Sequence, residues 1–416
     1  MKNLATIFRS YKFFQIFILS IISGMPFSLL YTSFAAWLTE NRIDIAVITT
    51  FAFARTPYSL KFIWAPFMDN LRIPILHNIL GKRRSFMVIT SISIAALLLC
   101  ISRLDPKIDL NLIRLLSICI GFMAATYDIS WDAMRIEMLK EEEQSLGVAV
   151  TSFGYRMGAF ITGAAALKLS SVYENWITVY EIVCAIFILG FLFILTVKDS
   201  KKISKPIPIS KIHTTIIKPF KEFFSRDKAF VILLGVVLYK TGDAMLSNVG
   251  INFYLKMGFS KDEIAKVVKI YAMVASILGS YLASYICIKI GNFNGLLICG
   301  VLEMLTNFLY IWIHHEPTYN VFVFCCISEN FTAGMGATAL VTYISNLCNK
   351  QYTATHYALL SSATAFMNST LTTYAGTLVN KLGWDNYFIF TVIISLPALF
   401  ILYYIKRHTE RSAEKV

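Results

Sequence analysis

Charged residues interrupt an apolar run in the stretch "ATYDISWDAMRIEML", residues 125–139. A charge inside a bilayer costs enough free energy that it is rarely kept for packing alone, so it usually marks a functional polar interior. A carboxylate in such a place can take up and release a proton. We therefore predict Asp128 and Asp132 as proton-coupling residues. For Asp132 and Glu137, a solvated helix end with Arg135 as the partner is the alternative interpretation.

A partner for Asp128 is expected from residues at the same depth. Arg55, Asp128 and Arg156 each lie about 12 residues from a predicted membrane face, which at 1.5 Å per residue is near the middle of the bilayer. We expect Asp128 and Arg156 to meet, and we include Arg156 among the proton-coupling residues. The alternative is a buried ion pair that only holds two helices together.

The second half of the chain carries ionisable residues at a comparable depth. Lys240 and Asp243 are three residues apart in "YKTGDAML", and Glu329 lies in "CISENFTAGMG". The pair either neutralises itself on one helix face or binds substrate. Aromatic side chains near these charges suit the faces of sugar rings, although single aromatics are also ordinary core or lipid contacts. The predicted substrate-binding residues are Arg55, Tyr127, Trp131, Tyr155, Tyr239, Lys240, Asp243 and Glu329, with Tyr31 also near the charges.

The composition predicts an integral membrane protein that holds these residues in helices. The chain has 416 residues, of which 56% are hydrophobic and 14% aromatic, which is too apolar for an ordinary soluble domain. Its first apolar segment lacks a small-residue cleavage site, so we expect a retained helix. Apolar runs of about 20 residues give twelve predicted spans: 13–38, 43–67, 85–102, 111–137, 145–168, 175–197, 228–255, 262–288, 294–313, 319–345, 353–379 and 386–405.

A polar, basic segment splits these spans into six and six. The predicted organisation is an N-terminal six-helix bundle (1–197), a basic cytoplasmic linker (198–227), a C-terminal six-helix bundle (228–405) and a cytoplasmic tail (406–416). Weak similarity between residues 36–60 and 253–278 is typical of repeated halves, and two pseudo-symmetric bundles predict an all-α secondary transporter of the major facilitator type. A twelve-span enzyme or a polymer flippase remains an alternative.

Basic residues gather on one side of this predicted topology. The excess of lysine and arginine on that side indicates that both termini are cytoplasmic. It also accounts for the net charge of +13 without nucleic acid as a partner.

The loop after the second span carries a possible conformational latch. Asp69 lies just after the end of the span, and Gly81, Arg83 and Arg84 follow it. This pattern resembles the loop signature of major facilitators, in which the aspartate pairs with arginine and with opposing helix ends. A plain cluster of basic residues at the cytoplasmic face is the alternative.

Several motifs together resemble the AmpG-type muropeptide permeases and, more distantly, the acetyl-coenzyme A transporters of the endoplasmic reticulum. They are "KFIWAPFMD" with "GKRR", "YDISWDA", "GYRMG", "LYKTGDA", "GMGATALVTYIS" and "CNKQYTATHYALLSS". The resemblance implies a bacterial inner-membrane importer of N-acetylglucosaminyl-1,6-anhydro-N-acetylmuramyl peptides. Such a protein uses the proton gradient and needs no cofactor. We expect a monomer with an anionic sugar-peptide substrate.

Other functions are less well supported by the residues. A porter for another anionic solute, such as a nucleotide-like or acyl-coenzyme A cargo, is the second hypothesis. A membrane enzyme is disfavoured, because no nucleophile elbow or phosphate loop is present. The eight cysteines have no CxxC spacing, so neither a disulfide framework nor a metal site is expected. His314 and His315 stand together at the predicted outer face, as a pH sensor or as part of a solvated loop.

Overall fold

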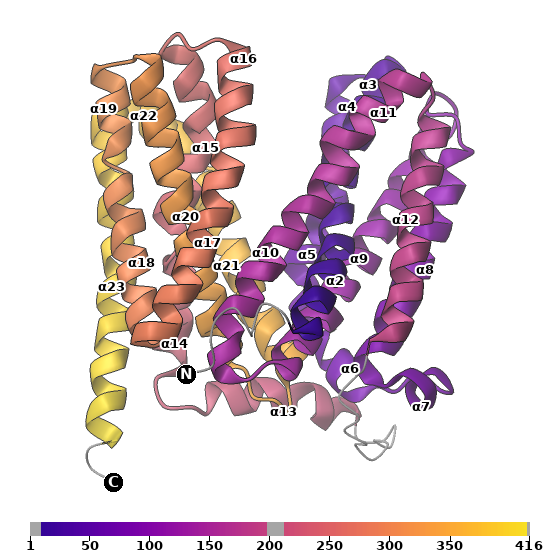
Figure 1. The fold of residues 1–416 in the computed structure, drawn as a ribbon, viewed down its shortest axis with the longest axis horizontal. Coiled ribbons are helices and arrows are strands. Elements are labelled where there is room, and N and C mark those ends of the chain that lie inside the picture. Colours follow the sequence, from indigo (N-terminus) through magenta and orange to yellow (C-terminus); the bar gives the residue numbers. More distant parts are fainter. Residues whose placement is uncertain (1–9, 198–211, 414–416) are drawn as a thin grey trace. The chain divides into compact units, whose positions relative to one another are not determined.

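The computed structural model describes residues 10–197 and 212–413, and all regular secondary structure in these ranges is helical (Figure 1). Each of the twelve predicted spans coincides with one helix or with a run of consecutive helices. The predicted all-α membrane fold is therefore confirmed. Residues 1–9, 198–211 and 414–416 lie outside the described part, so it contains only residues 212–227 of the predicted linker and 406–413 of the predicted tail.

The described residues form two compact units that do not follow the order of the chain. Unit 1 comprises the described residues within Met1–Lys140, Val150–Phe220 and Asn349–Leu359. Unit 2 comprises those within Glu141–Ala149, Lys221–Cys348 and Leu360–Val416. Each unit thus includes a short segment that is remote in sequence from the rest of it.

Unit 1 is built around long helices. The uninterrupted ones are α8 (Lys82–Ser102), α9 (Leu110–Met138) and α12 (Trp176–Thr196). Two further helices pass through a π-helical turn: α2 (Tyr11–Ser28) leads through η1 (Leu29–Ser33) into α3 (Phe34–Glu40), and α10 (Gln144–Phe160) leads through η5 (Ile161–Ala165) into α11 (Ala166–Tyr173). Short π-helical turns of this kind are frequent at functional sites.

Helices α2 and α10 approach each other at glycines. A Cβ atom added to Gly158 would lie 2.0 Å from the backbone oxygen of Ile21, and one added to Gly24 would lie 2.0 Å from that of Tyr155. Any larger side chain at these positions would push the two backbones apart. Close helix packing is therefore the role that the structure supports for these glycines.

The second predicted span is broken into short pieces. They are α4 (Ile45–Thr50), η2 (Phe51–Arg55), α5 (Thr56–Leu60), η3 (Lys61–Ile63) and α6 (Ala65–Asn70), followed by α7 (Leu76–Leu80). Pro57 and Pro66 stand in the first turns of α5 and α6, where proline is tolerated, whereas a continuing helix would lose a hydrogen bond there. The break gives this segment irregular backbone next to the charged residues of α9.

Unit 2 contains most of the remaining helices. They are α14 (Ala229–Leu238), α15 (Thr241–Lys256), α16 (Lys261–Ile264), η7 (Ala265–Tyr271), α17 (Ala272–Ile290), α18 (Asn292–Thr306), α19 (Leu309–His315), α20 (Tyr319–Leu347), α22 (Ala375–Leu382) and α23 (Trp384–Ala413). Helix α21 (Thr353–Thr372) begins in unit 1 and ends in unit 2, α13 (Ile212–Phe224) likewise contributes to both, and the first residues of α10, up to Ala149, belong to unit 2. An aromatic cluster that includes Phe253, Tyr254, Phe322 and Phe388 fills the core of unit 2.

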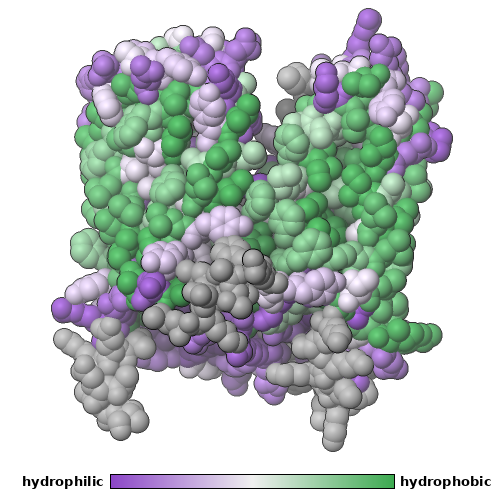
Figure 2. Space-filling model, viewed as in Figure 1, coloured by the Kyte–Doolittle hydropathy of each residue, from purple (hydrophilic) through white to green (hydrophobic). Residues whose placement is uncertain are grey.

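Membrane character follows from length and composition. Among the described residues, nine helical runs are long and apolar enough to cross a membrane. The three predicted spans outside that set are 43–67, 145–168 and 353–379, of which the first is broken and the other two contain many polar residues. Figure 2 shows hydrophobic residues along the helices and hydrophilic residues at their ends.

Candidate functional site

Asp128 is held in a polar pocket of unit 1. Its Oδ1 atom accepts a hydrogen bond of 2.6 Å from the hydroxyl of Ser23 on α2, and the whole residue is only 9% exposed. The cation that acts on Asp128 is Lys61 of η3. Sequence reasoning placed Arg156 in that position; the structure puts Lys61 there, while Arg156 lies half-buried on α10.

Lys61 faces a second carboxylate as well. It also acts on Asp132, one turn further along α9, and it is itself only 8% exposed. Asp132 additionally interacts with Arg135, whose Nη2 atom is 3.7 Å from its Oδ1, and with the hydroxyl of Tyr357. The Tyr357 ring lies 5.8 Å from both Lys61 Nζ and Arg135 Cζ. One lysine thus serves two carboxylates that are largely removed from water.

The broken second span explains how Lys61 reaches this place. In one continuous helix, Arg55 and Lys61 would be six residues apart and on different faces. The break between α5 and α6 puts Lys61 beside α9, and Ala65 and Met68 of α6 pack against Ile129 and Ala133 of α9. Lys61 was missed by the sequence analysis, although a basic residue inside a predicted span was a usable signal.

The predicted aromatic residues of unit 1 fall into two groups. Tyr127 and Trp131 are 2% and 1% exposed, so they belong to the core around α9. Tyr31, in contrast, is an exposed ring. Arg55 stacks between it and Phe27, with its Cζ atom 5.3 Å and 4.6 Å from the two ring centroids.

The half-buried Tyr155 packs beside this group. Its ring centroid is 6.3 Å from that of Phe27, and the side chain interacts with both Arg55 and Asp128. Arg55, Tyr31 and Tyr155 therefore present a cation and aromatic surfaces close to Asp128.

The predicted latch residues meet in unit 1. Asp69 Oδ1 accepts a hydrogen bond of 2.8 Å from Arg83 Nη2, and Arg83 also binds Glu137 Oε1 at 2.6 Å. Arg83 is 1% exposed, so two carboxylates neutralise one buried guanidinium. Gly81 precedes α8 with a φ of 88°, a conformation that glycine adopts without steric cost.

Asp69 also caps a helix that is remote in sequence. Its Oδ2 accepts hydrogen bonds from the backbone N–H of Thr355 at 2.8 Å and from the hydroxyl of Thr355 at 2.7 Å. Its Oδ1 accepts a longer bond of 3.3 Å from the N–H of Ala354. A carboxylate at the first turn of α21 is also favoured by the helix dipole. Arg84 has a different role, because its guanidinium donates to the carbonyls of Ile194 and Leu195 at the end of α12.

A second cluster of charges lies in unit 2. Lys240 Nζ is 2.8 Å from Asp243 Oδ2 and also binds Glu303 Oε1 of α18. Glu329 of α20 interacts with the same group and accepts a hydrogen bond of 2.5 Å from Asn330. Sequence analysis had named Lys240, Asp243 and Glu329, and the structure brings them together. It missed Glu303, a single acid inside an apolar span.

Tyr239 lies close to this cluster, but its hydroxyl is already engaged. It donates a hydrogen bond of 2.9 Å to the backbone oxygen of Leu296, and the residue is 5% exposed. The Tyr239 ring therefore lines the cluster, and its hydroxyl is not available to a ligand.

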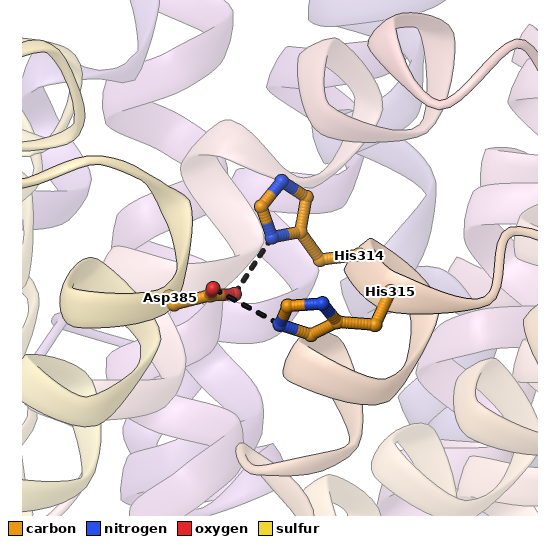
Figure 3. A group of neighbouring side chains, drawn as sticks. All are labelled: His314, His315 and Asp385. Atoms are coloured by element: carbon orange, nitrogen blue, oxygen red, sulfur yellow. Dashed lines mark hydrogen bonds and ion pairs between the residues drawn. The ribbon is translucent and has the colours of Figure 1, made fainter.

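His314 and His315 converge on a carboxylate near one end of unit 2 (Figure 3). His314 Nδ1 is 2.7 Å from Asp385 Oδ1, and His315 Nε2 is 3.0 Å from Asp385 Oδ2. One ligand atom from each residue lies within 4.8 Å of the others, so this trio of the described residues could hold a metal ion. Sequence analysis expected no metal site, which stays a prediction, and it did not anticipate this trio because Asp385 is distant in the chain. The two hydrogen bonds account for the geometry by tying α19 to α23.

Comparison with known proteins agrees with the fold. A family model described as Major Facilitator Superfamily matches residues 16–372 and 256–416. A Rickettsia conorii protein named "Putative transporter AmpG 4" is 45% identical over 97% of this chain and 98% of its own. The Escherichia coli K12 protein named anhydromuropeptide permease is 31% identical over 95% of this chain and 80% of its own.

Two solved structures share the architecture. The human organic anion transporter MFSD10 has a TM-score of 0.66 at 14% identity, covering 94% of this chain and 98% of its own. The proton:xylose symporter XylE has a TM-score of 0.65 at 14% identity, covering 95% of this chain and 96% of its own. At this identity the likeness concerns the fold.

Proposed function

Because the chain belongs to the Major Facilitator Superfamily, and within it to the AmpG-type permeases, we propose that it imports anhydromuropeptides with the proton gradient as its energy source. The chain is an integral protein of the bacterial inner membrane that transports a small molecule. The substrate is proposed from the name of the Escherichia coli relative.

The action of one buried lysine, Lys61, on both Asp128 and Asp132 is the observation that carries the coupling proposal. While both carboxylates are ionised, they neutralise the lysine. A proton that binds to Asp128 removes one of these negative charges, so Lys61 becomes available to a carboxylate of the substrate. Uptake of a proton and binding of an anion would then favour each other, which is the requirement for symport.

The neighbouring residues suit a ligand with sugar rings and carboxylates. Arg55 can pair with an anionic group, and the exposed ring of Tyr31 offers a face for a sugar. Tyr155 lies close to both. We propose that Tyr127 and Trp131, which are buried, support this surface from behind. Arg156 and the unit 2 residues Lys240, Asp243 and Glu329 remain proposed contributors to coupling and binding.

The cluster around Asp69 is proposed to stabilise one conformation of an alternating-access cycle. Its hydrogen bonds join α6, α8, α9 and the first turn of α21. Breaking them would release the segment 349–359 from the rest of unit 1. We also propose that both termini are cytoplasmic and that the protein functions as a monomer.

Uptake into proteoliposomes tests the proposed function. The purified full-length protein would be given radiolabelled anhydromuropeptide with an inward proton gradient, with and without an uncoupler. We expect uptake by the wild type that the uncoupler abolishes. Asp128→Asn should lose gradient-driven uptake. Asp385→Asn, which removes an exposed carboxylate far along the sequence, should keep it and serves as the matched control.

The outcomes separate substrate from coupling. If Asp128→Asn transports as well as the wild type under a gradient, Asp128 is not the coupling residue. If correctly folded wild type takes up no muropeptide, the substrate assignment is wrong. Uptake of an acyl-coenzyme A or a nucleotide under the same conditions would then favour a porter for another anionic solute.

A further inference from the structure

Among the described residues of unit 2, three acids lie around a single lysine that cannot neutralise all of them. Asp243, Glu303 and Glu329 gather around Lys240, and the side chains of Glu303 and Lys240 are 7% and 15% exposed. If every group were ionised, three carboxylates and one ammonium would carry a net charge of −2 inside a membrane-spanning bundle. Burying an unneutralised charge costs several kcal/mol even after relaxation. A bound proton would remove much of that cost.

The proximity of Asp243 to Glu329 also favours a bound proton. The Asp243 carboxyl group is near enough to act on that of Glu329 by a side-chain hydrogen bond. An ionised carboxylate only accepts hydrogen bonds, so two of them can share one only when one is protonated. Lys240 meanwhile binds Glu303 and Asp243, which leaves Glu329 as the acid without a cation at hydrogen-bond distance among the described residues.

Glu303 offers a place from which a proton can enter or leave. Its Oε1 binds Lys240, but its Oε2 is buried and has no hydrogen-bond partner among the described residues. That carboxylate packs against Gly336 of α20, where a Cβ atom would lie 1.8 Å from Oε2. A small cavity lies alongside, lined by Asp243, Glu303, Asn307 and Ser395 among others. Its volume of about 10 Å³ is about the space that one water molecule needs.

The other titratable groups around the cluster are tyrosines and cysteines, whose ordinary pKa values lie above physiological pH. They come from α15, α17, α18, α19, α20 and the residue before Lys240, and they are Tyr239, Tyr254, Cys287, Cys299, Tyr310 and Cys326. Helix α23 contributes the hydroxyl of Ser395. Lys240 is the only cation that the described residues bring to the cluster, so protons must supply any further positive charge.

We propose that Asp243, Glu303 and Glu329 form an exchangeable proton-binding site in unit 2, separate from Asp128 in unit 1. The proton resides on the Asp243–Glu329 pair and exchanges by way of Glu303 and the adjoining cavity. The protein thus holds protons at two places, one in each unit. A role of this site in transport rests on the proposed function. The presence of the site can be tested without assuming that function.

Infrared difference spectroscopy tests the site without any substrate. The purified full-length protein is taken through a pH change, and the carbonyl band of a protonated, buried carboxyl group is followed in H₂O and in D₂O, where it shifts. We expect a band in the wild type that disappears reversibly as the pH rises. It should be lost in Glu329→Gln and altered in Asp243→Asn, because both amides can replace the shared hydrogen bond but hold no exchangeable carboxyl proton. Asp385→Asn should leave the band unchanged.

If Glu329→Gln and Asp243→Asn both fail to fold, the infrared spectrum of Asp128→Asn tests the proposed site instead. The unit 2 band must persist in it, since that variant changes only unit 1. Absence of any protonated carboxyl band in Asp128→Asn, or a band that Glu329→Gln leaves unchanged, would overturn the proposal. So would a band that no pH change alters, because the proton would then be permanent. Failed muropeptide uptake with an intact band would overturn the proposed function alone.

Discussion

Asp69→Asn should loosen the segment 349–359 within unit 1. In asparagine one carboxylate oxygen is replaced by an NH₂ group. That group cannot accept the hydrogen bonds that the replaced oxygen accepts in the wild type. Hydrogen bonds to charged groups contribute about 1.5–3 kcal/mol each. Arg83 remains neutralised by Glu137 at 2.6 Å, so the larger cost of a buried charge without a counterion, about 3–5 kcal/mol, does not apply in full. We expect a loss of about 2–3 kcal/mol in the local free energy of opening.

Hydrogen–deuterium exchange with mass spectrometry measures this opening. Because each 1.4 kcal/mol is a factor of ten, exchange in peptides covering 349–359 should accelerate roughly 30- to 140-fold, while peptides from α12 should change little. Glu137→Gln is the matched control: Glu137 contacts Arg83 but none of the N–H groups of α21 that Asp69 accepts. Equal acceleration in the two variants, or none in Asp69→Asn, would refute the reasoning. Acceleration spread evenly over both units would refute it as well.

Three other changes have distinct expected outcomes. Lys61→Met should leave Asp128 without its cation and lower gradient-driven uptake at least about tenfold, as measured by initial rates at equal amounts of folded protein. Gly158→Ala should lower the melting temperature in detergent, because overpacking costs about 1–3 kcal/mol; Gly376→Ala, whose Cβ would meet nothing within 4 Å, should not. Asp385→Asn should change the free energy of unfolding by less than about 1 kcal/mol, since its contacts with His314 and His315 are partly exposed to solvent; a larger drop in chemical denaturation would contradict this.

Features that depend on local pattern were predictable from the sequence. Apolar runs located the spans, and the acids of "YDISWDA" were identifiable because charge is rare in such runs. The matched depth of Lys240, Asp243 and Glu329 also anticipated a cluster, since depth depends only on counting residues along a helix. These inferences need no knowledge of which helices are neighbours.

Features that depend on helix packing were not predictable in the same way. Lys61, rather than Arg156, acts on Asp128, because the second span breaks and turns Lys61 toward α9. Tyr357 reaches Asp132 from a segment more than two hundred residues later in the chain. Glu303 could be identified as a member of the cluster only after the structure showed that it pairs with Lys240. In each case the sequence did not show which residue of another helix would be the neighbour. Hydrophobic periodicity shows which face of a helix is buried, but not which helix packs against it.

The membership of residues 349–359 in unit 1 has a consequence for biosynthesis. A ribosome that has produced only the first 220 residues has not yet made Ala354 and Thr355, which supply the helix end that Asp69 caps. Unit 1 therefore cannot reach its final form as an early, independent folding step, and Asp69 must wait for Ala354 and Thr355 from the C-terminal part of the protein. Completion of the first unit is a late event in synthesis, and dividing the gene at the linker would separate Asp69 from Ala354 and Thr355.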